Sequence, residues 1–158
     1  MTSLQSAVRR RRAVAAAGAV SAGLLVLTAC DKPTPIATIT AGDNSVHSEA
    51  ICYKDGNDLT AADLTKCLKD TSGIETIKID PDDTVRFGVD PKIADQGWTI
   101  LMNDQQLTDS SKKTYRTIPG SVFFNAQYGA TGNSTKVSIK EGDKTTKGVW
   151  SFKLQKDS

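Results

Sequence analysis

Histidine and cysteine are scarce in this chain of 158 residues, and their scarcity excludes several kinds of site. The one histidine, His47, lies in a polar stretch beside a turn, so no site built from several histidines is possible. The three cysteines lack the close spacing of zinc ligands. The sequence also lacks a glycine-rich phosphate loop and a nucleophile elbow. We therefore expect a solvated His47, no cofactor and no metal.

A long apolar run is missing as well. The apolar stretch 13–27 has 15 residues, and as a helix it spans roughly 22 Å of a hydrocarbon core of about 30 Å. Four arginines, Arg9–Arg12, come directly before it. A basic segment followed by a short apolar segment is typical of a secretory signal peptide, which is removed after export. The sequence therefore predicts export rather than a permanent membrane helix.

The segment Leu27-Thr28-Ala29-Cys30 follows at once. It resembles the lipobox of bacterial lipoproteins. The resemblance implies a diacylglyceryl group on the sulfur of Cys30 and cleavage after Ala29, which makes residues 1–29 the signal peptide. It places the mature protein on the extracytoplasmic face of the cell membrane, with the membrane as a partner through the lipid. An ordinary signal peptide is the alternative, and both Sec and twin-arginine export stay open.

The wider chain resembles small lipoproteins of high-GC Gram-positive bacteria that have no assigned function. The likeness lies in the arginine- and alanine-rich signal segment, in the start at Cys30–Pro35 and in the ending Gly148–Leu154. It implies no activity.

Without the signal peptide, the chain has the length of one ordinary domain. Removing Arg9–Arg12 from the 20 basic residues leaves 16 against 18 acidic residues, a net charge of −2. This near-neutral charge, with dispersed basic residues, indicates no nucleic-acid partner. Residues 30–35 contain two prolines and are predicted to be an extended, lipidated tether. Residues 36–158 are predicted to form the domain.

Apolar residues alternate with polar ones along most of the domain, which predicts strands. Eight or nine short strands separated by turn residues favour a mostly β, immunoglobulin-like antiparallel β-sandwich over a barrel. We expect Trp98 and Trp150 in its core, and a hairpin in which the turn Asp80–Asp83 joins two paired strands. The expected strands are Ile36–Ala41, Val46–Tyr53, Ile77–Ile79, Val85–Val89, Trp98–Met102, Gln105–Leu107, Thr114–Ile118, Val122–Tyr128, Lys136–Lys140 and Val149–Leu154.

One short helix is expected over residues 61–69. Thr60 and Asp63 have the spacing of a capping box, and Leu64 and Leu68 recur at the helical spacing. Export places the two cysteines other than Cys30 in an oxidising compartment. We therefore predict a disulfide between Cys52 and Cys67, with free thiols or a metal pair as alternatives. Such a disulfide closes a loop of about 15 residues and contributes about 3 kcal/mol in the chain-entropy model.

The segment 90–97 is predicted to be a polar loop between strong strands, and Asp90, Asp95, Gln96 and Trp98 are its candidate binding residues. Loops at one end of a sandwich commonly carry binding sites. The loop 127–133 is a second candidate.

The turn Asp80–Asp83 offers three aspartates that could serve calcium. It lacks the glycine and glutamate spacing of known calcium loops, so a plain turn is favoured.

These features favour a non-enzymatic binding or structural module with an unknown protein or cell-envelope partner. Two alternatives stay open. The run Ile77–Trp98 is similar to the chagasin type of cysteine-peptidase inhibitor, which presents a loop before an aromatic residue. An enzyme that acts on cell-wall sugar through two carboxylates is the other.

Overall fold

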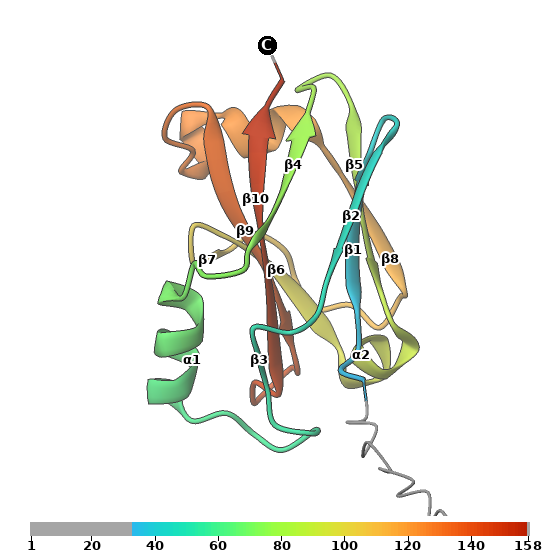
Figure 1. Ribbon diagram of the computed structural model, residues 1–158, viewed down its shortest axis with the longest axis vertical. Coiled ribbons are helices and arrows are strands. Elements are labelled where there is room, and N and C mark those ends of the chain that lie inside the picture. The colour runs from blue at the N-terminus through green and yellow to red at the C-terminus, as the bar shows by residue number, and fades with distance from the viewer. Residues whose placement is uncertain (1–32, 158) are drawn as a thin grey trace, which may run out of the picture. The chain divides into compact units, whose positions relative to one another are not determined.

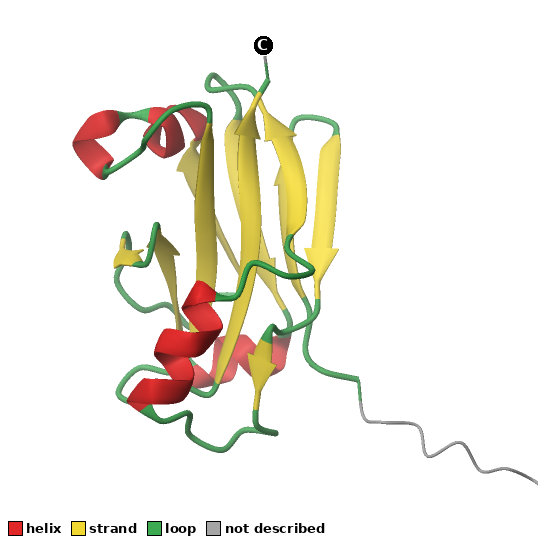
Figure 2. Ribbon diagram, turned by 60° about the vertical axis from the view of Figure 1, so that its left-hand side comes forward, coloured by secondary structure: helices red, strands yellow, loops and turns green. Residues whose placement is uncertain are grey.

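Two β-sheets pack face to face in the computed structural model, which describes residues 33–157 (Figures 1 and 2). One sheet has the strand order β2-β1-β5-β8, and the other has the order β3-β10-β9-β6-β7, with β4 also paired to β10. The strands are β1 (Ala37–Ala41), β2 (Asn44–Ser48), β3 (Cys52–Tyr53), β4 (Glu75–Ile79), β5 (Thr84–Val89), β6 (Trp98–Met102), β7 (Gln105–Gln106), β8 (Tyr115–Pro119), β9 (Ser134–Glu141) and β10 (Gly148–Lys156).

The strand order is that of an immunoglobulin-like sandwich. β1, β5 and β8 take the places of strands A, B and E, whereas β6, β9 and β10 take those of C, F and G. β7 lies beside β6 as strand C′ does in variable-type domains. The predicted fold class, a mostly β immunoglobulin-like sandwich, is therefore confirmed.

The predicted hairpin around Asp80–Asp83 is wrong. β4 pairs in parallel with β10 in one sheet, whereas β5 pairs with β1 and β8 in the other. The turn thus carries the chain from one sheet to the other. Ile77, Ile79, Val85 and Phe87 are all buried in the one hydrophobic core between the sheets. Alternation of apolar and polar residues predicts which face of a strand is buried. It does not show whether two successive strands pair within one sheet or lie in two sheets that pack face to face.

The strand expected over Val122–Tyr128 is also wrong. The segment forms two short 3₁₀ helices, η1 (Gly120–Phe124) and η2 (Ala126–Tyr128). Gly120 allows the close approach, because a Cβ there would lie 2.7 Å from the carbonyl oxygen of Asp80. The turn that follows buries Phe123 against Phe87, with ring centroids 5.7 Å apart. One aromatic side chain thus enters the core without a strand.

Helix α1 (Ala61–Lys69) has the predicted bounds. The capping box is present, since the Thr60 hydroxyl accepts from the amide of Asp63 and the Asp63 carboxylate accepts from the amide of Thr60. Asp70 ends the helix in an extended conformation. A second helix, α2 (Pro91–Gln96), was not predicted and lies between β5 and β6.

The two tryptophans are core residues, as predicted. Trp98 and Trp150 have no exposed surface, and each indole N–H donates to a backbone carbonyl oxygen. Trp98 donates to Lys113 at 2.7 Å and Trp150 to Pro35 at 2.8 Å. Pro35, which lies inside the expected tether, is therefore already a buried part of the packed domain.

Residues 42–74 form an insertion between β1 and β4 that contains β2, β3 and α1 (Figures 1 and 2). β2 pairs with β1 at the edge of the first sheet, β3 pairs with the end of β10, and α1 packs on β10. A disulfide between Cys52 on β3 and Cys67 on α1 joins its two halves, as predicted. Within residues 33–157, no helix has both the length and the apolar content needed to cross a membrane.

We expect the double variant Cys52→Ser, Cys67→Ser to lose about 3 kcal/mol of unfolding free energy, because the loop of 15 residues is no longer closed in the unfolded chain. Urea unfolding measures the loss, and far-UV circular dichroism should show unchanged strand content. The parent treated with a reductant is the control and should match the variant. A variant as stable as the oxidised parent would contradict the prediction.

Candidate functional site

The segment predicted to be the polar binding loop is helix α2. Pro91 stands at the first helical position, where its fixed φ and missing N–H favour a helix start, and Ile93 and Ala94 are buried beneath the helix. Asp90 has a structural role, since its Oδ2 accepts from the amide of Ile36 at 2.8 Å. The segment therefore closes one end of the sandwich and does not project as the loop of a chagasin-type inhibitor would.

The structure does not bring the four candidate binding residues Asp90, Asp95, Gln96 and Trp98 together in one site. Trp98 lies in the core and is not available to a ligand. Asp95 and Gln96 are exposed on α2 and line a common hollow. Cys30 lies outside the described residues.

The other candidates of the sequence are placed on the surface. His47 is exposed on β2. In the turn Asp80–Asp83, the carboxylate of Asp80 accepts from the amide of Asp82 at 2.9 Å, which is ordinary turn geometry. Within the described residues, no three histidine, cysteine or acidic residues are grouped as metal ligands.

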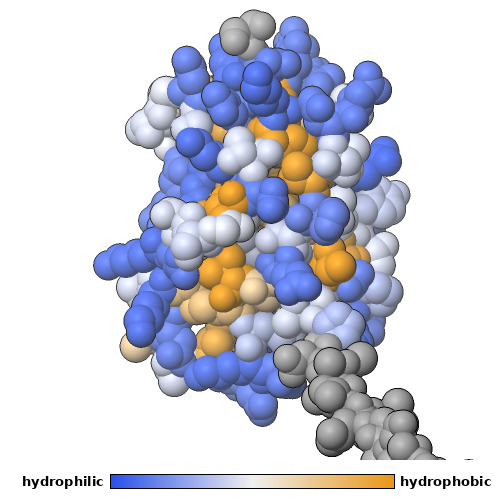
Figure 3. Space-filling model, viewed as in Figure 1, coloured by the Kyte–Doolittle hydropathy of each residue, from blue (hydrophilic) through white to orange (hydrophobic). Residues whose placement is uncertain are grey.

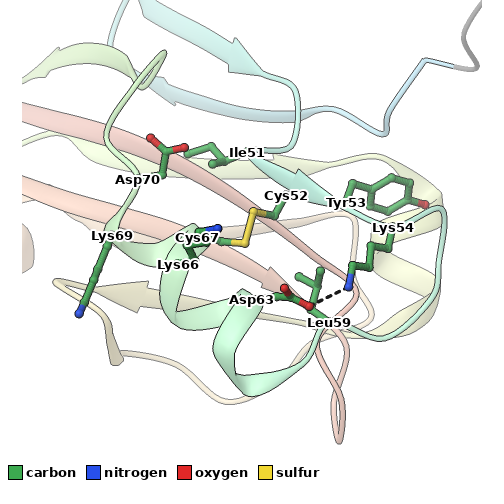
Figure 4. Close-up of a pocket in the computed structure, with 10 residues that line it drawn as sticks. All are labelled: Ile51, Cys52, Tyr53, Lys54, Leu59, Asp63, Lys66, Cys67, Lys69 and Asp70. Atoms are coloured by element: carbon green, nitrogen blue, oxygen red, sulfur yellow. Dashed lines mark hydrogen bonds and ion pairs between the residues drawn. A yellow bond between two sulfur atoms is a disulfide. The ribbon is translucent and has the colours of Figure 1, made fainter.

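A hollow lies between α1 and β3 and is called the α1 groove here (Figure 4). Its volume is about 580 Å³, within the range of small-molecule sites. Apolar surface gathers over this region of the molecule (Figure 3). The lining residues are Ile51, Cys52, Tyr53, Lys54, Leu59, Asp63, Lys66, Cys67, Lys69 and Asp70.

The floor of the α1 groove is apolar. Ile51 and Leu59 remain half-buried beside the disulfide, and both are held by backbone bonds to β10 and the turn before it. The amide of Ile51 donates to the carbonyl of Val149 at 2.8 Å, and that of Leu59 to Thr146 at 2.6 Å. A fixed backbone with exposed apolar side chains forms a preformed surface for an apolar ligand.

Two of the polar groups at the rim of the α1 groove are paired with each other, since Lys54 Nζ lies 2.7 Å from Asp63 Oδ2. Lys69 points away from the groove (Figure 4). Hydrogen bonds from Lys54 and Thr60 lower the pKa of Asp63 to about 2. Hydrogen bonds from Ser72 lower the pKa of Asp70. These carboxylates stay charged near neutral pH and are poor proton donors or acceptors for catalysis.

A polar hollow continues from the α1 groove through Ile51 and Asp70. His47, Glu49 and Glu75 line it, and its volume is about 420 Å³. The single histidine therefore lies beside the groove, although the sequence places it on a separate strand.

A smaller hollow, called the end hollow here, opens beside α2 and has a volume of about 230 Å³. It brings together residues from the insertion, from α2 and from the end of β9. Its lining residues are Tyr53, Gly56, Lys92, Asp95, Gln96 and Glu141. Tyr53 lines both this hollow and the α1 groove, and its ring lies 6.1 Å from that of Trp150.

Glu141 is the residue of this site that the sequence did not reveal. It is 1% exposed, and its Oε2 is buried without a hydrogen-bond partner in the described part of the chain. Burial raises the pKa of Glu141, and the nearby charge of Lys147 opposes that rise. The signal was the alternation along β9, where Val137, Ile139 and Glu141 all point into the core.

The comparisons with known proteins give a weak similarity to a solved structure and no match by sequence. No protein-family model matches the chain, and no curated protein matches it. Among solved structures, it is similar to one described as structures of Clostridium thermocellum CbhA fibronectin(III)-like modules. The identity is 11% and the TM-score 0.37, over 56% of this chain and 95% of that chain. A similarity at this level carries no argument, so the fold class rests on the strand order and pairings above.

We expect Glu141→Gln to raise the unfolding temperature by a few degrees near about pH 7. Because burial raises the pKa of Glu141 above 4.5, the parent loses stability as the pH rises from 4.5 through the folded-state pKa. The glutamine variant has no such loss. Its advantage should disappear below pH 4.5, where the carboxyl is neutral in both states.

Thermal unfolding followed by circular dichroism over this pH range measures the difference. Glu75→Gln, at an exposed glutamate of β4, is the matched control and should unfold with the parent at every pH. A constant difference between Glu141→Gln and the parent at all pH values would contradict the prediction.

Proposed function

We propose that the protein is a lipoprotein of the extracytoplasmic membrane face whose domain binds a partner without catalysing a reaction. The order of basic segment, apolar segment and Leu27-Thr28-Ala29-Cys30 supports the anchor. Two acyl chains on Cys30 give a stable attachment, whereas a single chain gives only a marginal one.

The α1 groove is the observation that supports a binding role. Its volume is that of a small-molecule site, its floor is apolar, and its backbone is fixed by the disulfide and by bonds to the sheet. We propose that it accepts an apolar group of a cell-envelope partner. Burial of that group against Ile51 and Leu59 supplies the driving force, at about 25 cal/mol per Å² of apolar surface removed from water.

The chemistry of the groove supports a non-catalytic role. Its two carboxylates are held ionised by hydrogen bonds, and its two sulfurs are joined in the disulfide. A general acid or base works best with a pKa near the working pH, and a cysteine nucleophile needs a free thiolate. The groove is therefore suited to binding.

We expect Cys30→Ala to prevent lipidation. The variant should then be absent from the membrane fraction as a cleaved, lipid-bearing protein. Membrane fractionation and mass spectrometry of the N-terminal peptide measure this outcome. Thr28→Ala keeps a small residue in the lipobox and is the control that should stay processed and membrane-bound. A cleaved Cys30→Ala protein that remains in the membrane would contradict the lipid anchor.

We expect Ile51→Glu to abolish partner binding in the α1 groove while leaving the fold intact, because the side chain is half-buried and lines the floor. A photo-crosslinking residue at position 66, on the rim, should form an adduct in native membranes that mass spectrometry identifies. The adduct should disappear with Ile51→Glu. Thr117→Glu, on exposed β8 of the other sheet, should leave it unchanged. An adduct that survives Ile51→Glu would contradict the groove as the binding site.

A further inference from the structure

Helix α1 depends on its disulfide for attachment to the sandwich. Of the nine described residues of α1, Cys67 alone is buried, and its sulfur is bonded to that of Cys52 on β3 (Figure 4). Leu64 and Leu68 of the helix are partly buried. In the part of the chain that the structure describes, the hydrophobic core between the sheets contains no residue of α1. The core therefore neither holds the helix nor depends on it.

The sheet face that carries α1 is only partly apolar. Cys52 and Val149 are paired in register, so their side chains lie on the same face, and Ser151 follows on that face two residues later. Ser151 pairs with Ser138 of β9, and their buried hydroxyls bond to each other at 2.8 Å. Small hydroxyl side chains offer a helix less apolar surface to cover than aliphatic ones do. Packing on this face therefore stabilises the docked helix weakly.

The polar ties of α1 are weak as well. Lys136 of β9 donates to the carbonyl of Leu68. The ion pair of Lys54 and Asp63 lies at the surface, with side chains 48% and 38% exposed. Exposed ion pairs contribute little to stability, because water screens them. The disulfide is therefore the strongest link between the helix and the sheet.

Both connections of α1 are loosely packed. A Cβ added at Gly56, before the helix, or at Gly73, after it, would meet no atom within 4 Å. The chain is held again at Leu59, which bonds to Thr146, and at Glu75, where β4 begins. The segment 60–74 between these points can leave the sheet as one unit. A helix of nine residues is unstable alone in water, so a detached α1 unfolds.

The disulfide is accessible from the α1 groove. Both cysteines are lining residues of the groove (Figure 4). Cys52 is partly exposed, whereas Cys67 is 3% exposed. A reductant that enters the groove therefore reaches the sulfur of Cys52 first.

We propose that the disulfide is a redox switch: a dithiol reductant opens it, and its reduction releases α1 while the sandwich stays folded. A thiolate of the dithiol attacks Cys52 Sγ, the S–S bond breaks, and Cys67 leaves as a thiolate that takes up a proton. The second thiolate of the dithiol breaks the mixed disulfide, and Cys52 becomes a thiol. Two electrons pass to the protein sulfurs, and the dithiol becomes a disulfide.

The release of α1 follows from these contacts alone, whereas its effect on binding rests on the proposed function of the α1 groove. Without α1, the groove loses the wall that carries Lys66 and Cys67. Ile51 then lies on an open surface, since its backbone stays bonded to Val149. A partner held between α1 and β3 is therefore released on reduction.

Hydrogen exchange of backbone amides in the full chain, followed by mass spectrometry, tests the release with dithiothreitol as the dithiol. We expect the α1 amides to exchange at least tenfold faster after reduction, because the link that closes the loop of 15 residues no longer opposes opening. The amides of β9 and β10 should stay protected over the same time. Unchanged exchange of α1, or loss of protection in β9 and β10 together with α1, would overturn the proposal.

The matched control is the double variant Cys52→Ser, Cys67→Ser. Its α1 amides should exchange as fast as those of the reduced parent, and dithiothreitol should not change their rate. In the parent, replacement of dithiothreitol by glutathione disulfide should restore the protection of α1. A response of the variant to dithiothreitol, or protection that does not return in the parent, would overturn the proposal.

The photo-crosslinking residue at position 66 separates this proposal from the proposed function. In native membranes, the protein with the intact disulfide should form the adduct, and the double cysteine variant should not. An equal adduct in the double variant would overturn the effect of reduction on binding. An adduct in neither protein would contradict the proposed function, and hydrogen exchange alone would then decide whether reduction releases α1.

Discussion

Strand β10 is the element on which the rest of the domain depends, because three strands pair with it. β9 occupies one side over most of its length, and on the other side β3 pairs near residue 148 and β4 pairs over residues 152–156. The insertion 42–74 thus leaves the first sheet after β2, passes through β3 beside β10, and leads into β4, which also pairs with β10. The disulfide ties α1 to β3, and Lys136 of β9 donates to the carbonyl of Leu68 at the end of the helix. The insertion therefore adds β2, β3 and α1 to an otherwise ordinary immunoglobulin-like sandwich.

The two hollows differ because they lie on opposite faces of the same sheet. The α1 groove covers the outer face, where Cys52 and Val149 pair and no second sheet packs. The end hollow is the unfilled end of the inner face, where Glu141 takes a core position and Gly148 leaves room for its carboxylate. Tyr53 borders both, so a change at this residue would disturb the two together. An apolar surface and a carboxylate-lined hollow thus adjoin without sharing chemistry.

Local signals in the sequence predicted what depends on neighbours along the chain. The capping box at Thr60 predicted α1, and the apolar run over Trp98–Met102 predicted a strand, which the structure buries along its whole length. The predictions that failed mostly concern contacts between residues far apart in the chain. Alternation of apolar and polar residues could not show that β4 and β5 belong to different sheets. Helix α2 was not predicted because the segment after its first residue, Pro91, is mostly polar. Glu141 was missed because one acidic residue in an inward-facing row has meaning only when the row's neighbours are known.

The bond from Trp150 to Pro35 has a consequence for the orientation of the domain. It fixes the start of β1 at the end of the sandwich that α2 closes, where Ile36 also bonds to Asp90 (Figure 1). The five residues from Asp31 to Pro35 reach at most about 17 Å. Under the lipid attachment proposed for Cys30, a tether of this length would hold the α2 end of the domain within that distance of the membrane surface.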